Sequence, residues 1–183
     1  MNKKVLILSG SPRKGGNSDL LCDEFMRGAI EVGNEVTKIR VAEKKIGYCS
    51  ACYYCQKSGG VCAKKDDMPA ILQMMIDADV IVLSSPVYFY SIDAQLKTLI
   101  DRCVSRWSDF GRFKGTEFWH IITAADTNRD MMSATLEGLR GFMRDCMEGS
   151  VERGVLYGTG AYEKGEVCSL PVFQEAYEAG KSC

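Results

Sequence analysis

The sequence has almost no net charge and no long apolar run. Its 183 residues include 23 Lys and Arg against 24 Asp and Glu, a formal net charge of −1. This balance gives no electrostatic reason to expect binding to nucleic acid or to an anionic membrane surface. No apolar run approaches the roughly 20 residues that span a bilayer. No secretory signal precedes the first apolar run, so we expect a cytoplasmic protein without a membrane segment.

Histidine is also scarce, which limits the catalytic machinery that the chain can carry. The single histidine, His120, lies within the apolar run Phe118–Thr123 (FWHIIT). One histidine in such a run does not support a Ser/His/Asp or Cys/His arrangement. We therefore expect a packed, hydrogen-bonded core histidine and assign no catalytic residue.

Short β-rich runs alternate with helical segments along the chain, which predicts a parallel sheet covered by helices on both faces. Val5–Ser9 and Val80–Ser84 are almost entirely apolar, as expected of central strands buried on both sides. No repeat, low-complexity tract or linker divides the chain, so residues 1–183 are predicted to form a single α/β domain. The five predicted strands are Val5–Ser9, Asn34–Arg40, Val80–Ser84, Phe118–Thr123 and Arg153–Tyr157.

The segment Ser9–Ser18 (SGSPRKGGNS) joins the first strand to a helix that begins near Asn17 or Ser18. A helix N-terminus presents free N–H groups and a partial positive charge, which suit a phosphate. Gly16 follows Gly15 where a Walker A loop needs Lys, and the G-x-G-x-x-G dinucleotide motif is absent. The second strand ends in Lys38–Arg40 rather than in an acidic ribose ligand. The loop therefore predicts a monophosphate site. Its candidate side-chain donors are Ser9, Ser11, Arg13, Asn17 and Ser18.

A second candidate ligand segment, Ser85–Ser91 (SPVYFYS), follows the third predicted strand and contains three consecutive aromatic residues. In a doubly wound sheet of order 2-1-3-4-5, strands 1 and 3 flank the point where the strand order reverses. The aromatic segment is therefore predicted to lie beside the phosphate loop, where a flat isoalloxazine ring can pack against it. Packing of these aromatics into a dimer interface is the alternative, and both roles are compatible.

Four of the nine cysteines lie within fourteen residues, in the spacing C-x2-C-x2-C-x6-C. Such a run lets three thiolates converge on a small inorganic cluster, which the fourth closes from the far side of a loop. Other interpretations stay open: a zinc site, which usually has two separated C-x2-C pairs, a redox-active dithiol or disulfide, and cysteines without a ligand. The cysteines lie in an insertion, residues 41–66, that is too long for a plain connection. They are Cys49, Cys52, Cys55 and Cys62.

These motifs together resemble the NADPH-dependent FMN reductase and iron–sulfur flavoprotein family. The resemblance rests on GSPRKGGNS, on SSPVYFYSIDAQLKTLIDR and on the cysteines before Asp66-Asp67-Met68. It implies a flavodoxin-like fold, bound FMN, a [4Fe-4S] cluster on the four cysteines, and a homodimer or homotetramer, although some relatives resemble this segment without carrying a cluster. By resemblance, Ser11, Arg13, Asn17 and Ser18 hold the phosphate, Pro86, Val87, Tyr88 and Phe89 line the flavin ring, and Ala124 and Asp126 complete the pocket.

We therefore expect an FMN-dependent oxidoreductase that passes electrons from NAD(P)H or ferredoxin to a small-molecule acceptor, through the cluster where one is present. FMN accepts a hydride and can release electrons singly, so it joins two-electron donors to one-electron acceptors. One alternative is a non-enzymatic flavodoxin-like electron carrier or redox sensor. The net charge of −1 does not favour a carrier, because carriers usually find partners through strong surface charge. A reductase that releases free reduced flavin is the third possibility.

Overall fold

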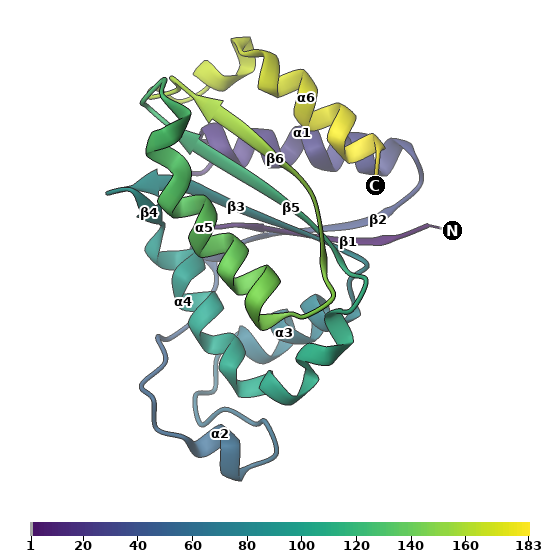
Figure 1. The fold of residues 1–183 in the computed structure, drawn as a ribbon, viewed down its shortest axis with the longest axis vertical. Coiled ribbons are helices and arrows are strands. Elements are labelled where there is room, and N and C mark those ends of the chain that lie inside the picture. Colours follow the sequence, from purple (N-terminus) through teal and green to yellow (C-terminus); the bar gives the residue numbers. More distant parts are fainter. Residues whose placement is uncertain (1) are drawn as a thin grey trace.

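The computed structural model describes residues 2–183 and shows a twisted parallel sheet with helices on both faces (Figure 1). The order along the sheet is β2–β1–β3–β5–β6, which matches the predicted order 2-1-3-4-5. An additional short strand, β4, pairs antiparallel with the end of β3. The predicted flavodoxin-like class is therefore confirmed. The strands are β1 Lys4–Ser9, β2 Glu35–Arg40, β3 Val80–Tyr88, β4 Ser91–Ile92, β5 Glu117–Ala124 and β6 Val151–Thr159.

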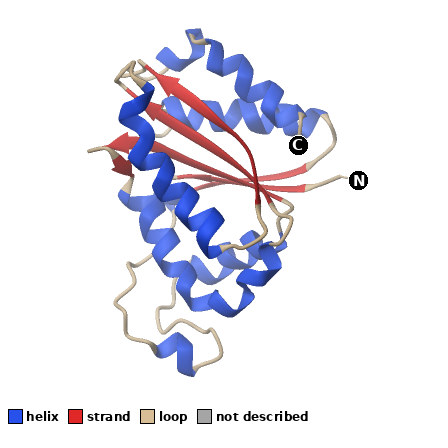
Figure 2. Cartoon of the chain, in the orientation of Figure 1, coloured by secondary structure: helices blue, strands red, loops and turns tan. Residues whose placement is uncertain are grey.

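The helices form one layer on each face of the sheet (Figure 2). α1 and α6 lie side by side on one face, while α3, α4 and α5 cover the other (Figure 1). Among residues 2–183 no helix is both long and apolar enough to cross a membrane. The helices are α1 Asn17–Glu31, α2 Tyr54–Lys57, α3 Met68–Asp77, α4 Ala94–Arg102, α5 Ser133–Arg140 and α6 Pro171–Lys181.

The central strands supply both hydrophobic cores because successive side chains of a strand point to opposite faces of the sheet. Val5 and Ile7 of β1 pack in the core under α1 and α6, and Leu6 and Leu8 pack in the core under α3, α4 and α5. All four side chains are buried. Burial on both faces explains why β1 and β3 are continuous apolar runs in the sequence.

The aromatic segment after the third predicted strand is a β-hairpin rather than an irregular loop. β3 continues four residues past its predicted end, because β5 pairs with it as far as Pro86 and β4 pairs with Val87 and Tyr88. Phe89 and Tyr90 form the turn with φ angles of 47° and 62°. Two such residues make a type I′ turn, which usually contains Asn-Gly. The prediction missed the hairpin because neither residue is a usual turn former.

The contact between α1 and α6 depends on two glycines. A Cβ atom at Gly28 would lie 2.1 Å from the Tyr177 carbonyl oxygen, and one at Gly180 would lie 2.0 Å from the Phe25 carbonyl oxygen. Alanine is therefore incompatible with this helix spacing, because backbone atoms would have to move. The two glycines therefore let the backbones of α1 and α6 approach each other directly.

We expect Gly28→Ala to lower the free energy of unfolding by about 2 kcal/mol, because overpacking outweighs the roughly 1 kcal/mol by which Ala favours a helix over Gly. Urea unfolding measures the difference. Gly111→Ala is the matched control, because a Cβ atom there meets nothing within 4 Å. Equal unfolding midpoints for the two variants would contradict the prediction.

Candidate functional site

A cavity of about 220 Å³ lies at the carboxyl ends of the central strands; we call it the strand-end cavity. Its walls come from the loop after β1, the end of β3, the end of β5 and the segment after β6. The strand order reverses between β1 and β3 at this edge, which is where open α/β sheets bind ligands. The lining residues are Ser11, Arg13, Gly16, Asn17, Ser18, Pro86, Val87, Tyr88, Thr123, Ala124, Ala125, Ala161 and Tyr162.

Most of the predicted cofactor residues line this cavity, and three do not. Ser9 is buried beneath it, with its hydroxyl 3.2 Å from Asp19 Oδ1. Phe89 is fully exposed at the tip of the β3–β4 turn. The Asp126 carboxylate accepts a hydrogen bond from the Asn128 N–H at 2.8 Å within the turn after β5. The structure thus brings the phosphate loop and the aromatic segment together, as predicted, but places these three side chains elsewhere.

The segment after β6 contributes to the cavity and was missed by the sequence analysis. Ala161 and Tyr162 line it, and the Tyr162 carbonyl oxygen accepts a hydrogen bond from Arg13 Nη1 at 3.1 Å. No local motif marks this segment. The available signal was topological, because the carboxyl ends of parallel strands meet at one edge of the sheet.

Asp19 holds the phosphate loop in shape. Its carboxylate accepts a hydrogen bond from the Gly15 N–H at 2.8 Å and pairs with Lys38 Nζ at 2.7 Å and Arg40 Nε at 3.2 Å. Burial raises the pKa of Asp19, but the hydrogen bonds from Lys38 and Gly15 outweigh it and leave that pKa below 3.8. The basic end of β2 therefore neutralises Asp19, so the carboxylate does not repel an anion at the helix N-terminus.

The Asn17 side chain ties α1 to the segment after β6. Its Nδ2 donates to the carbonyl oxygens of Ala161 at 3.0 Å and Glu163 at 2.9 Å, and its Oδ1 accepts from the Gly165 N–H at 3.0 Å. The side-chain amide is thus engaged within the protein. Asn17 can contribute to an anion site through its backbone N–H, since the first N–H groups of a helix have no partner within the helix. Ser18 adds a second such N–H and a hydroxyl.

Comparison with known proteins decides the family. The sequence profile described as NADPH-dependent FMN reductase matches residues 3–139. The chain belongs to the NADPH-dependent FMN reductase family. Iron–sulfur flavoproteins from Methanocaldococcus jannaschii and Archaeoglobus fulgidus are 46% and 38% identical to this family member over 99 residues, or 54% of the chain. Those matches cover 51% and 44% of the relatives, so the chain spans about half their length.

Solved structures agree on the architecture of this FMN reductase family member. An FMN-dependent NADH-azoreductase from Bacillus anthracis, in complex with FMN, aligns with a TM-score of 0.75. The alignment covers 98% of each chain at 16% sequence identity. At this identity the likeness shows the flavodoxin-like fold alone.

A second cavity, of about 160 Å³, contains all four predicted cysteine ligands in its walls; we call it the cysteine cavity. It lies between the long insertion and the end of α4 and shares no lining residue with the strand-end cavity. The insertion, with α2, is at the bottom of Figure 1. The insertion holds only a 3₁₀ turn, Val41–Glu43, and the single-turn helix α2. The structure therefore brings Cys49, Cys52, Cys55 and Cys62 together around one space.

The backbone around Cys52 is strained. Ala51 and Tyr53, on either side of it, have φ angles of 50° and 55°, a region that non-glycine residues rarely adopt. Such residues cost about 1–3 kcal/mol each and occur where ligands are clamped. The Tyr54 N–H lowers the pKa of Cys52 by hydrogen bonding to its sulfur. In the described part of the chain, no three His, Cys, Asp or Glu side chains converge closely enough for a single metal ion.

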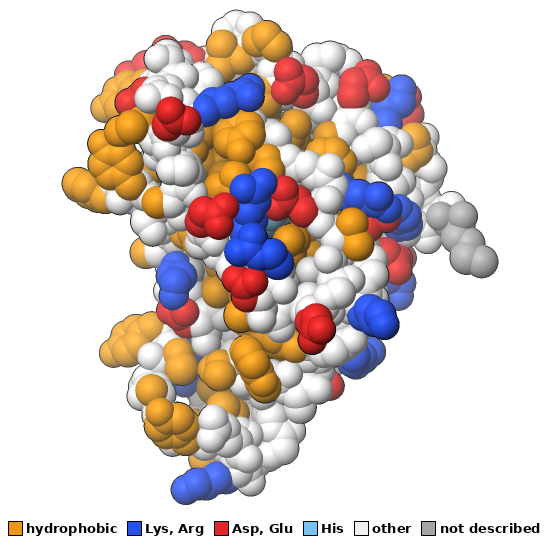
Figure 3. Space-filling model, viewed as in Figure 1, with side chains coloured by type: hydrophobic (Ala, Val, Ile, Leu, Met, Phe, Trp, Pro, Cys, Tyr) orange, Lys and Arg blue, Asp and Glu red, His pale blue; other side chains and the backbone are white. Residues whose placement is uncertain are grey.

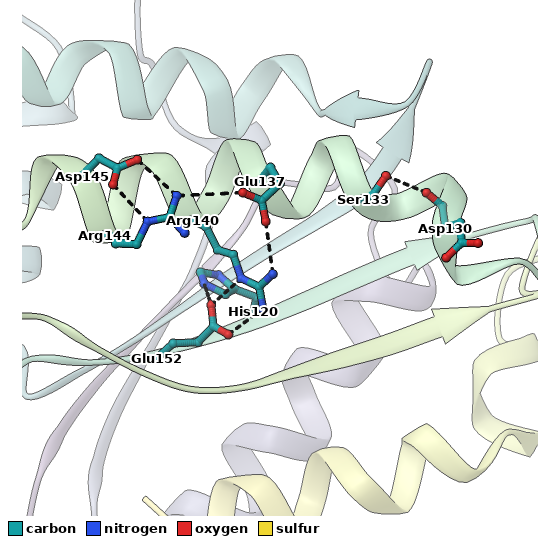
Figure 4. Close-up of polar contacts among 8 residues, drawn as sticks. All are labelled: His120, Asp130, Ser133, Glu137, Arg140, Arg144, Asp145 and Glu152. Atoms are coloured by element: carbon teal, nitrogen blue, oxygen red, sulfur yellow. Dashed lines mark hydrogen bonds and ion pairs between the residues drawn. The ribbon is translucent and has the colours of Figure 1, made fainter.

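His120 is packed inside the sheet, as predicted, but it is not hydrogen-bonded. Both ring nitrogens are buried without a hydrogen-bond partner within residues 2–183. Glu152 Oε2 lies 3.6 Å from His120 Nε2, yet both Glu152 oxygens accept hydrogen bonds from Arg140 at 2.8 Å (Figure 4). Burial lowers the pKa of His120 to about 4. The histidine is therefore neutral at pH 7, and it does not line the strand-end cavity.

This buried histidine makes stability depend on pH. Between pH 6.5 and about 4 the unfolded chain binds a proton at His120 that the folded chain does not, so stability falls as pH falls. Each pKa unit is worth about 1.4 kcal/mol, which gives a loss of about 3 kcal/mol across the window. We expect His120→Leu to remove this contribution. Urea unfolding at pH 7 and pH 5 (roughly the middle of the window) tests it, and an equal pH effect in both proteins would contradict it.

Proposed function

We propose that the chain is an FMN-dependent oxidoreductase that passes electrons from NAD(P)H or ferredoxin to a small-molecule acceptor. One observation carries the proposal: the strand-end cavity joins a free helix N-terminus to the aromatic end of β3. These are the two chemistries that FMN requires, an anion site for its phosphate and an apolar surface for its ring. Membership of the NADPH-dependent FMN reductase family supports the same conclusion.

In this proposal the N–H groups at the start of α1 and the hydroxyls of Ser11 and Ser18 bind the phosphate. Arg13 reaches the same loop while its Nη1 is held by the Tyr162 carbonyl oxygen. Pro86, Val87 and Tyr88 orient the ring, together with Ala124 at the end of the neighbouring strand β5. FMN itself supplies hydride acceptance and single-electron release. None of the steps assigned to the chain needs a catalytic acid or base, which agrees with the buried, neutral His120.

We further propose that Cys49, Cys52, Cys55 and Cys62 hold a [4Fe-4S] cluster. All four line one cavity, and the strained backbone around Cys52 is of the kind found at ligand clamps. A lone zinc ion would need its thiolates gathered at about 2.3 Å, whereas these cysteines surround a space and do not converge on one point. The cluster would supply single-electron transfer at low potential. The name iron–sulfur flavoprotein of the M. jannaschii and A. fulgidus relatives supports this assignment.

Exposed aromatic residues support a homodimer or homotetramer. Phe89 and Tyr90 occupy a strained turn and project into solvent, next to the partly exposed Tyr88. Hydrophobic side chains protrude at the left edge of the molecule, where β3 and β4 meet (Figure 3). The energetic cost of a strained turn with exposed apolar side chains is offset when another protein surface covers that turn. Sedimentation velocity of the purified chain tests the proposal, and a single monomeric species would overturn it.

The deciding experiment combines composition with rapid kinetics. We expect anaerobically purified protein to contain FMN, iron and acid-labile sulfide, and its flavin absorption to bleach rapidly when NADPH or NADH is mixed in by stopped flow. Rapid reduction by ferredoxin, but not by NADPH or NADH, would identify ferredoxin as the electron donor, and the proposed oxidoreductase function would still hold. Reduction by neither donor would favour the alternative, an electron carrier or redox sensor. Protein that binds no FMN after reconstitution would overturn the proposed function.

A further inference from the structure

A buried arginine lies behind the cysteine cavity. Arg102, the last residue of α4, is 1% exposed and contributes to the cavity wall. Its Nη1 donates to the Gly47 carbonyl oxygen at 2.6 Å and to Asp66 Oδ2 at 2.6 Å, and its Nη2 donates to Asp66 Oδ1 at 3.0 Å. Gly47 and Asp66 stand at the two ends of the cysteine segment. Arg102 thus closes that segment into a loop against α4.

The guanidinium has more hydrogen-bonding capacity than the protein uses. Within residues 2–183, Arg102 Nε is buried and has no hydrogen-bond partner. A buried donor without an acceptor is unfavourable, so it calls for an explanation. Cys62 and Arg102 line the same cavity, and Asp66 first, then the Cys62 thiol, raise the pKa of the guanidinium. A neutral thiol is a weak acceptor, whereas a metal-bound thiolate is a good one.

We propose that Arg102 is a tuning residue for the cluster: its buried positive charge, in the wall of the cavity that Cys62 also lines, raises the reduction potential. This inference rests on the proposed [4Fe-4S] cluster. Reduction adds negative charge to the cluster, and a buried cation beside it stabilises the reduced form. Asp66 opposes the effect, because its carboxylate cancels part of the Arg102 charge at close range.

Three variants separate tuning from a merely structural role. Arg102→Gln removes the cation, and we expect about a tenfold lower equilibrium constant for one-electron reduction, which corresponds to about 59 mV. Asp66→Asn breaks the same ion pair but leaves the cation uncompensated, so the potential should rise. Arg102→Lys keeps the charge without the guanidinium fork and should stay near the wild-type potential. If the ion pair has only a structural role, Arg102→Gln and Asp66→Asn both break it and should shift the reduction potential in the same direction.

Lys64→Gln is the matched control, because Lys64 lines the same cavity but is half-buried and therefore screened by water. We expect a shift several-fold smaller than that of Arg102→Gln. The readout is the midpoint potential of the cluster in an anaerobic redox titration followed by electron paramagnetic resonance, with iron and sulfide content measured alongside.

The outcomes are distinct. An unchanged reduction potential in Arg102→Gln, or a lower reduction potential in Asp66→Asn, overturns the tuning role of Arg102. Neither result contradicts the proposed cluster. Wild-type protein that lacks iron and sulfide after anaerobic reconstitution overturns the cluster and this inference together. If Arg102→Gln cannot hold the cluster, the sign of the shift in Asp66→Asn decides the question alone.

Discussion

Ser18→Asp is expected to weaken FMN binding about a thousandfold while leaving riboflavin binding within a few-fold of wild type. Ser18 is the second residue of α1, is buried, and lines the strand-end cavity. A carboxylate about 4 Å from the phosphate repels it by about 4 kcal/mol at an effective dielectric constant near 20. Every 1.4 kcal/mol is a factor of about ten in the dissociation constant. Riboflavin has no phosphate and does not experience this repulsion.

Quenching of flavin fluorescence measures both dissociation constants. Ser18→Ala is the control, because it removes one hydroxyl without adding charge and should cost about tenfold or less. If Ser18→Asp weakens FMN and riboflavin equally, the substitution has damaged the ring half of the site and the phosphate assignment fails. Unchanged FMN affinity would place the phosphate away from the N-terminus of α1.

Cys52→Ser is expected to abolish the cluster and leave the flavin in place. Iron and acid-labile sulfide per chain should fall by about tenfold or more, because a serine hydroxyl is a poor substitute for a soft thiolate ligand. FMN content should be unchanged, because the cysteine cavity and the strand-end cavity share no lining residue. Metal and flavin analysis of anaerobically purified protein measures both quantities.

Cys168→Ser is the matched control. Cys168 is exposed, as Cys52 is, but lies outside the cysteine cavity, so its variant should keep wild-type iron, sulfide and flavin. Cys52→Ser protein with wild-type iron would exclude Cys52 as a ligand. Equal loss of iron from both variants would indicate general oxidative damage and contradict the assignment.

Local sequence patterns predicted the architecture well, because the burial of a strand or helix face fixes the spacing of apolar residues along the chain. Apolar runs mark strands buried on both faces, and amphipathic spacing marks the helices that cover them. The start of α1 was predicted near Asn17 or Ser18 and lies at Asn17, and the parallel strands follow the predicted order. The ends of the strands were predicted less accurately, and the β3–β4 hairpin was not predicted. A type I′ turn made of Phe89 and Tyr90 carries no sequence signal of the usual kind.

The placement of single side chains was harder to predict. Asn17 was chosen as a phosphate ligand because its amide is a donor, yet the segment after β6 uses that amide completely. Ser9 was chosen for its hydroxyl, which points instead to Asp19. Arg102 was not singled out at all, since its role follows from Asp66, which is 36 residues away in the chain. In each case the competing partner is distant in sequence.

By itself the sequence determined which segments form the central strands, where α1 begins and how the cysteines are spaced, because these depend on periodicity, on helix termini and on short separations along the chain. Only the tertiary structure decided which donors stay free in the strand-end cavity and which charge lies behind the cysteines. Those outcomes depend on hydrogen-bond partners and burial that come from elements far apart in the chain. A polar side chain binds a ligand only where no nearer protein group has already satisfied it.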